Sequence, residues 1–162
     1  MPKLTDHELN TFLQERGHLV RIGTVDASGQ PWVLPAWFLS RNDRLYVTLR
    51  GQTRFWDNLV LNPKASFLID ETQPPARKAV INGHVELVYD IGRDDEWRDL
   101  YRDIAERYST PDRAGAYLTA TKSVLRRLIA MPLSDASVTT WRLPVDGEDP
   151  SGIFAKRYWT NP

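Results

Sequence analysis

Cysteine is absent from the 162-residue chain, which excludes disulfides, thiol catalysis and cysteine-ligated metals. The chain also lacks a net charge, with 21 Lys and Arg against 21 Asp and Glu, so nothing suggests nucleic acid or an anionic membrane as a partner. No apolar run approaches the roughly 18 residues of a membrane-spanning helix, and no secretory signal is apparent. We therefore expect a cytoplasmic protein with neither a membrane nor a nucleic-acid partner.

The short motifs of several enzyme classes are missing as well. No GxSxG, P-loop or GxGxxG occurs, and no serine or carboxylate is placed as an obvious nucleophile. His7, His18 and His84 are scattered without the spacing of metal ligands. The sequence therefore predicts neither a catalytic side chain nor a metal site.

The residues that are present predict a mainly β protein with flanking helices. Apolar alternation and turn residues predict strands at 18–25, 31–39, 44–50, 65–70, 78–89, 124–131 and 136–142. Helices are predicted at 5–16, in a short segment that ends at Asn62-Pro63, at 94–108, and from Thr110-Pro111 to about residue 121. Because the later helices are grouped and do not alternate with strands, the order favours an antiparallel barrel over a doubly wound parallel sheet.

Two positions inside predicted strands need special backbone. Pro35 cannot donate to a strand ladder, so we expect the strand 31–39 to be unpaired or bulged there. Asn82-Gly83 marks either a bulge or a hairpin turn within 78–89. We favour the bulge, because a turn would leave two segments too short for the core.

The joint between the strand 44–50 and the helix that follows has the residues of an anion site. Free N–H groups and the positive dipole end make a helix start a good phosphate site. Thr53 can cap this helix or bond a phosphate oxygen, while Arg54 can donate two parallel hydrogen bonds and Arg50 can close a third side. The alternative is a capped surface helix with two solvated arginines.

The aromatic residues before this joint allow two interpretations. Trp32, Trp37 and Phe38 would suit the wall of a flat aromatic ligand. The same residues would equally suit the hydrophobic core, which is the more common role of such side chains.

Taken in order, these segments resemble the flavin-binding split β-barrel of the pyridoxamine 5′-phosphate oxidase-like proteins. The resemblance spans about residues 8–143. Its motifs are Gly23-Thr24-Val25, Ser28-Gly29-Gln30-Pro31, Pro35-Ala36-Trp37, Val47-Thr48, Gln52-Thr53-Arg54, Asn58-Leu59 and Asn62-Pro63. The later segments VINGHVELV and LYRDIAERY also fit, and RRLIAMPLSDASVTTW is similar to the subgroup of deazaflavin (F420)-dependent reductases.

The resemblance implies a homodimer with cofactor sites at its interface. The cofactor would be FMN, or F420 in the sister group, and hydride would pass to or from a small conjugated substrate. The cofactor-binding residues it implies are Val33, Leu34, Pro35, Ala36 and Trp37 with Thr48 and Leu49 at the ring, and Arg50, Thr53 and Arg54 at the phosphate.

One position departs from the family pattern. The family often has a lysine shortly after the small hydroxyl residue at the helix start, where this chain has Phe55 or Trp56. Either Arg54 and Arg50 act without it, or binding is weaker, or the cofactor differs. A non-catalytic flavin or haem binder and a structural dimer therefore remain alternatives, and vitamin B6 oxidation is not predicted.

The domain boundary is expected near residue 143. Residues 1–143 would form the split barrel, and 144–162 would form a tail rich in Gly, Pro and Asp. The tail ends in the aromatic segment IFAKRYW, so we expect it to dock on the domain or on a partner chain.

Overall fold

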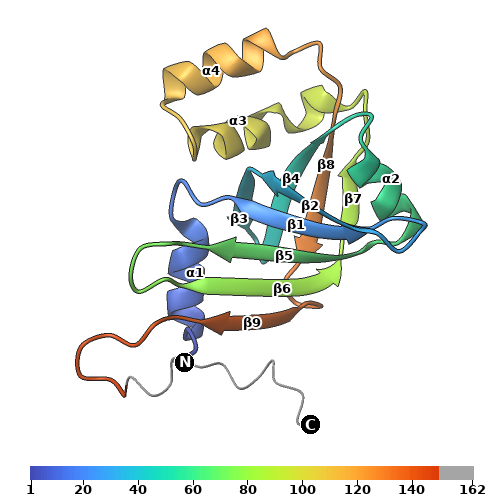
Figure 1. The fold of residues 1–162 in the computed structure, drawn as a ribbon. Helices are drawn as coiled ribbons and strands as arrows, with labels where there is room; N and C mark the ends of the chain where they lie inside the picture. Colours follow the sequence, from blue (N-terminus) through green and yellow to red (C-terminus); the bar gives the residue numbers. More distant parts are fainter. Residues whose placement is uncertain (150–162) are drawn as a thin grey trace.

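Nine strands pair into two antiparallel sheets in the computed structural model, which describes residues 1–149 (Figure 1). One sheet has the order β2-β1-β5-β6-β9, formed by Pro31–Ala36, Val20–Val25, Lys64–Asp70, Lys78–His84 and Ser137–Trp141. The other has the order β3-β4-β8-β7, formed by Phe38–Arg41, Arg44–Arg50, Arg126–Pro132 and Glu86–Tyr89. This architecture confirms the predicted split antiparallel barrel with flanking helices.

The helices flank the two sheets. They are α1 (Asp6–Gln14), α2 (Arg54–Leu61), the 3-10 helix η1 (Asp94–Trp97), α3 (Arg98–Glu106) and α4 (Pro111–Ala120). The helices α3 and α4 lie side by side at one end of the barrel, and α1 and α2 lie on other sides of it (Figure 1).

The helix starts follow the predicted caps. The side chains of Thr5, Thr53 and Thr110 each accept a hydrogen bond from a backbone N–H in the first turn of their helix. Thr5 and Glu8 form the predicted capping box. The first helix ends at Gln14, before the predicted residue 16, because Glu15 is already extended with ψ 146°.

Two predicted strands cross from one sheet to the other. The segment 31–39 breaks at Trp37 and divides into β2 and β3. The break predicted at Pro35 is wrong, because Pro35 stays in register opposite Arg21. Since β2 is an edge strand, a residue without an N–H can be accommodated there.

The segment 78–89 crosses in the same way, at Val85, and divides into β6 and β7. The bulge predicted at Asn82-Gly83 is wrong, because both residues keep an unbroken register opposite Ser66 and Ala65 of β5. The signal for a break was real, but the break lies two residues later, where the strand leaves one sheet for the other.

Strand β8 separates two hydrophobic clusters, and every one of its residues is buried. Ile129 and Met131 pack in the barrel core, whereas Leu128 packs with Trp97 and Ile104 under α3 and α4. This double burial explains the nearly continuous apolar sequence of the strand. Its first two residues are arginines, and the first of them, Arg126, lies at the buried edge of the site described below.

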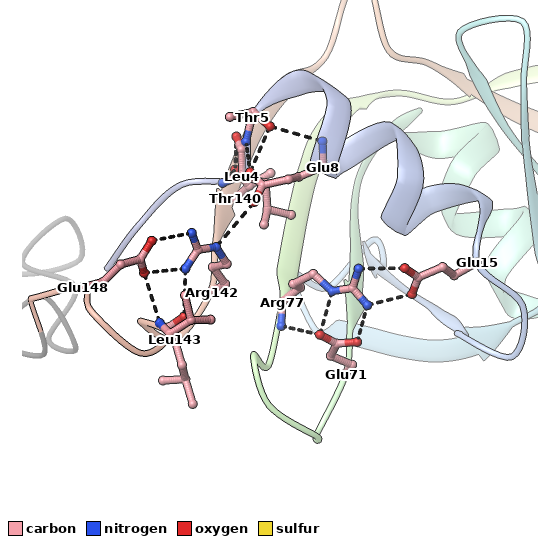
Figure 2. A network of polar contacts seen from close by, with 11 residues as sticks. Leu4, Thr5, Glu8, Glu15, Glu71, Arg77, Thr140, Arg142, Leu143 and Glu148 are labelled. Carbon is pink, nitrogen blue, oxygen red and sulfur yellow. Dashed lines mark hydrogen bonds and ion pairs between the residues drawn. The ribbon is translucent and has the colours of Figure 1, made fainter.

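Polar contacts join the two ends of the described chain (Figure 2). The Leu4 N–H donates to Thr140 Oγ1 over 3.0 Å, and Arg142 donates to both carboxylate oxygens of Glu148 over 2.7 and 2.8 Å. The first residues of the predicted tail are thus held by an ion pair. Residues 150–162, which include its aromatic segment, lie outside the described residues. Within residues 1–149, every helix is too short or too polar to span a bilayer.

Candidate functional site

A cavity of about 380 Å³ lies where β2, β4 and α2 meet the α3–α4 pair. One side is formed by the end of β2 and another by the end of β4 with the start of α2. Helices α3 and α4 and strand β8 supply the third side. The residues that line it are Leu19, Leu34, Pro35, Ala36, Trp37, Thr48, Leu49, Arg50, Thr53, Tyr101, Tyr117 and Arg126.

Eight of the ten residues predicted at a cofactor site line this cavity. The exceptions are Val33, whose side chain is turned out of the cavity and is 68% exposed, and Arg54. The guanidinium of Arg54 lies over the ring of Trp32, 4.7 Å from its centroid. A role for these ten residues in cofactor binding stays a prediction.

The joint between β4 and α2 is fixed by close backbone packing. The Gly51 N–H donates to the Leu125 carbonyl over 2.8 Å, and the Gly51 carbonyl accepts a hydrogen bond from Arg127. A Cβ at Gly51 would lie 3.2 Å from Ile91 Cγ2 and 3.3 Å from the Leu125 oxygen, so only glycine fits without a shift. Thr53, which caps the helix, therefore presents the start of α2 to the cavity.

Aromatic rings form the wall opposite this joint. Trp37 stacks on Tyr108 with ring centroids 5.1 Å apart and meets Tyr117 edge-on at 5.4 Å. The Tyr108 hydroxyl donates to the His18 carbonyl over 2.7 Å and accepts from the Phe38 N–H over 3.0 Å. Of the two interpretations of the aromatic residues, Trp37 therefore fits the wall, while Phe38 is fully buried in the barrel core.

Arg126 is the site residue that sequence reasoning missed. It is only 6% exposed, its guanidinium lies 4.9 Å from the centroid of the Tyr101 ring, and its Nη2 donates to the Tyr117 hydroxyl over 3.0 Å. Its Nε has no hydrogen-bond partner among the described residues. Two adjacent arginines at the start of an otherwise apolar strand were the signal that could have identified it.

Tyr101 adds a neutral donor beside this arginine. The residue is 4% exposed and its hydroxyl has no hydrogen-bond partner within residues 1–149. Burial raises the pKa of the Tyr101 hydroxyl above its ordinary value. The phenol is therefore protonated at neutral pH.

The residues in place of the family lysine do not face the cavity. Phe55 is buried in the barrel core. Trp56 lies under the guanidinium of Arg127, with 4.5 Å between that group and the ring centroid. Arg127 in turn donates to Asp90 Oδ1 over 2.6 Å. The positive charge in this cavity comes instead from Arg50 on β4 and Arg126 on β8.

A second cluster of ionisable groups lies between α1 and the β5–β6 hairpin. Glu15, His18 and Glu71 place one potential metal-ligand atom each within 4.8 Å of one another. Arg77, however, donates to both carboxylates over 2.7 Å, and these bonds lower the pKa of Glu15 and of Glu71 (Figure 2). The cluster is therefore a structural ion-pair network, since its carboxylate oxygens are already bonded to an arginine.

Comparison with known proteins matches residues 5–130 to the family model described as pyridoxamine 5′-phosphate oxidase. The haem oxygenase HutZ of Vibrio cholerae is 30% identical over 107 residues, which are 62% of this chain and 59% of that protein. The chain thus matches less than two thirds of the length of this curated relative.

Solved structures show the same fold at lower identity. The conserved hypothetical protein Rv2991 of Mycobacterium tuberculosis superposes with a TM-score of 0.71 at 17% identity, over 91% of this chain and 94% of that one. An F420 reductase superposes with a TM-score of 0.60 at 22% identity, over 85% of this chain and 98% of that one. The family model covers most of the chain, and the chain therefore belongs to the pyridoxamine 5′-phosphate oxidase family.

Proposed function

We propose that this protein binds a flavin-type cofactor, FMN or F420, in the cavity between β2, β4 and the α3–α4 pair, and acts as an oxidoreductase on a small conjugated substrate. The observation that supports this most is the convergence of eight sequence-predicted residues on one cavity of about 380 Å³. The similarity to an F420 reductase keeps the deazaflavin as the alternative cofactor.

The chain offers distinct groups to the two parts of such a ligand. The backbone from Leu34 to Trp37 and at Thr48 and Leu49 would edge the ring system, whose flat face suits the neighbouring aromatic wall. Thr53, Arg50 and Arg54 would hold the phosphate at the start of α2. Arg126 and Tyr101, which line the same cavity, would add polar groups suited to a ligand rich in oxygen.

A bound flavin or deazaflavin supplies the hydride transfer itself. The residues of this chain would orient the ring, exclude water from one of its faces and donate hydrogen bonds to it. The neutral phenol of Tyr101 is one such donor. This role needs no side-chain nucleophile, and the sequence has no motif that would place one.

Titration of the purified protein with FMN and with F420 tests the proposal, with ring fluorescence and the visible spectrum as readouts. We expect one of the two to bind stoichiometrically and its absorption bands to shift in the complex. A protein that takes up neither cofactor would overturn the proposed function.

Haem is the competing ligand, because the relative HutZ is a haem oxygenase. None of the three histidines lines the cavity, so the side chains that this chain would offer there to hold a haem iron are Tyr101 and Tyr117. The same titration with haemin separates the two possibilities. A Soret band at stoichiometric haemin, with no uptake of flavin or F420, would favour the haem binder.

We also propose that the protein is a homodimer. Val33 lies on β2 opposite Gly23, is 68% exposed, and lines a shallow hollow of about 640 Å³ together with Trp32. Val25, which is 42% exposed, lines the same hollow, and a contiguous apolar patch of this kind would be covered by a second copy of the chain. Light scattering after size exclusion should give the dimer mass, and Val33→Lys should lower it toward the monomer. A monomeric wild-type protein would contradict this proposal.

A further inference from the structure

We propose that Arg126, together with Arg50, forms a built anion site that holds a phosphate monoester inside the cavity. The identity of the ligand as a flavin phosphate rests on the proposed function, whereas the anion site can be tested separately from it. The inference starts from the property that sets Arg126 apart, a buried charge with neither a carboxylate nor a carbonyl oxygen on its guanidinium among the described residues.

The surroundings of Arg126 contain aromatic rings and a hydroxyl but no carboxylate on its guanidinium. Within residues 1–149, its side chain contacts the rings of Tyr101 and Tyr117 and bonds the Tyr117 hydroxyl, and its Nε has no partner. Asp94 accepts from the backbone N–H of Arg126 over 3.2 Å and makes no ion pair with the guanidinium. Residues 150–162 contain no Asp or Glu that could supply the missing side-chain charge.

The other buried arginines of the described chain are compensated. Arg127 is 9% exposed and pairs with Asp90 over 2.6 Å. Arg107 is 8% exposed, has no carboxylate partner and leaves its Nε unbonded among residues 1–149, but its other nitrogens donate to the carbonyls of Leu13, Gln14 and Glu15 over 2.6–3.0 Å. Burial of an ion is costly unless it is paired or fully hydrogen-bonded. Arg126 has only the Tyr117 hydroxyl as an acceptor for its guanidinium among the described residues, and an anionic ligand would lower that cost.

A second cation lies directly across the strand pair. Arg50 and Arg126 are register partners of β4 and β8, and both line the cavity. Like charges at opposed positions of two antiparallel strands repel each other. An anion between them turns this repulsion into two attractions. Thr53, at the start of α2, lines the same cavity and brings the positive end of a helix dipole to the same ligand.

The donors favour a phosphate monoester over a singly charged group. Two guanidinium groups can each donate parallel hydrogen bonds to separate oxygens, and the cap of α2 can offer a third contact. A dianion with three terminal oxygens satisfies all of them. FMN ends in such a group, whereas riboflavin is the same molecule without it.

The experiment compares FMN with riboflavin by titration of ring fluorescence in the full-length protein. Arg126→Gln should weaken FMN binding by about 10- to 100-fold and leave riboflavin affinity within about twofold. Arg126→Lys should recover part of the loss, because it keeps the charge. Arg77→Gln is the matched control, as it removes a half-buried arginine far from the cavity, and it should leave both affinities unchanged.

Inorganic phosphate gives a readout that does not depend on flavin. At constant ionic strength, phosphate in place of chloride should raise the melting temperature of the wild type and of Arg77→Gln, but not of Arg126→Gln. If the wild type binds neither FMN nor riboflavin but its melting temperature rises with phosphate, the anion site is supported and the proposed flavin function is overturned. If phosphate protects Arg126→Gln as well as wild type, the anion site is overturned.

The flavin titration has its own negative outcomes. FMN bound no more tightly than riboflavin by the wild type, or equally well by wild type and Arg126→Gln, would overturn the anion site and leave the flavin function intact. Should Arg126→Gln fail to fold, Arg50→Gln decides, because Arg50 is exposed and not needed for packing. Its FMN affinity should fall about three- to tenfold, and no change would refute the proposal.

Discussion

Two arginines in different regions of the molecule have nearly the same contact with an aromatic ring but opposite electrostatic surroundings. The Arg77 guanidinium lies 4.6 Å from the Phe12 ring centroid, and that of Arg126 lies 4.9 Å from the Tyr101 ring centroid. Arg77 is bracketed by two carboxylates (Figure 2), while Arg126 has none on its guanidinium among the described residues. The contrast separates a charge that stabilises the fold from a charge that is available to a ligand.

The contrast also shows why burial alone does not identify a site. The side chain of Arg77 is 19% exposed and saturates Glu71 and Glu15 with four hydrogen bonds of 2.7 Å. Arg126 is more deeply buried and yet less satisfied. A buried arginine that lacks hydrogen-bond partners is thus a better indication of a ligand site than burial alone.

The largest effect is expected when Arg77, the paired arginine, is removed. Arg77→Gln should lower the free energy of unfolding by about 3 kcal/mol, because Glu15 and Glu71 would then face each other without a cation between them. Urea denaturation measures this change. A loss below about 1 kcal/mol would show that the network contributes little, and that pairing with carboxylates does not make Arg77 a stabilising residue in contrast to Arg126.

Acid should remove part of the same stabilisation without a mutation. The hydrogen bonds from Arg77 hold the pKa of Glu15 and of Glu71 below their ordinary values in the folded state. Their contribution is therefore complete above the unfolded-state pKa and is lost as pH falls through the folded-state pKa. Stability of the wild type should fall below about pH 4.5 more steeply than that of Arg77→Gln. Parallel curves for the two proteins would contradict this linkage.

A smaller effect is expected at Arg54, the sequence-predicted phosphate ligand whose guanidinium now lies over Trp32. Arg54→Ala should weaken FMN binding by about fivefold, or about 1 kcal/mol, because the group would have to leave the ring to reach the phosphate. Fluorescence titration against Arg126→Gln gives the comparison. A larger loss at Arg54 than at Arg126 would reverse the proposed ranking of the two residues.

The smallest effect is expected in the stability of Arg126→Gln without ligand. Removal of an unpaired buried charge relieves its desolvation, and this gain offsets the lost contact with Tyr101. The free energy of unfolding should therefore change by less than about 1 kcal/mol. A loss as large as that of Arg77→Gln would mean that Arg126 is a structural arginine like its counterpart.

Local patterns were sufficient to predict the element that begins the site. Leu45, Val47 and Leu49 alternate with less buried neighbours in β4, as predicted, and Thr53 caps α2. These features depend on residues within a few positions of one another. The family motifs supplied the order of the strands and thereby the split barrel.

Features that depend on distant pairing were not predictable in the same way. Trp37 and Val85 break their strands because the two sheets diverge there, and the local signals, Pro35 and Gly83, lie two residues before the breaks. Arg126 lies in a strand whose apolar pattern predicted only burial. Its contact with Tyr101 and Tyr117 arises because α3 and α4 pack over that end of β8, far along the chain.

The crossings at Trp37 and Val85 also decide which part of the molecule can admit a ligand. Each of these two crossings is a single residue long, so the sheets cannot slide apart there without breaking strand pairs on both sides of it. The α3–α4 pair, in contrast, joins β7 and β8 through the loops at 90–93 and 121–125. We therefore expect the helices to move more readily than the strands when a ligand enters, and amide hydrogen exchange should be faster in α3 and α4 than in β4 and β8.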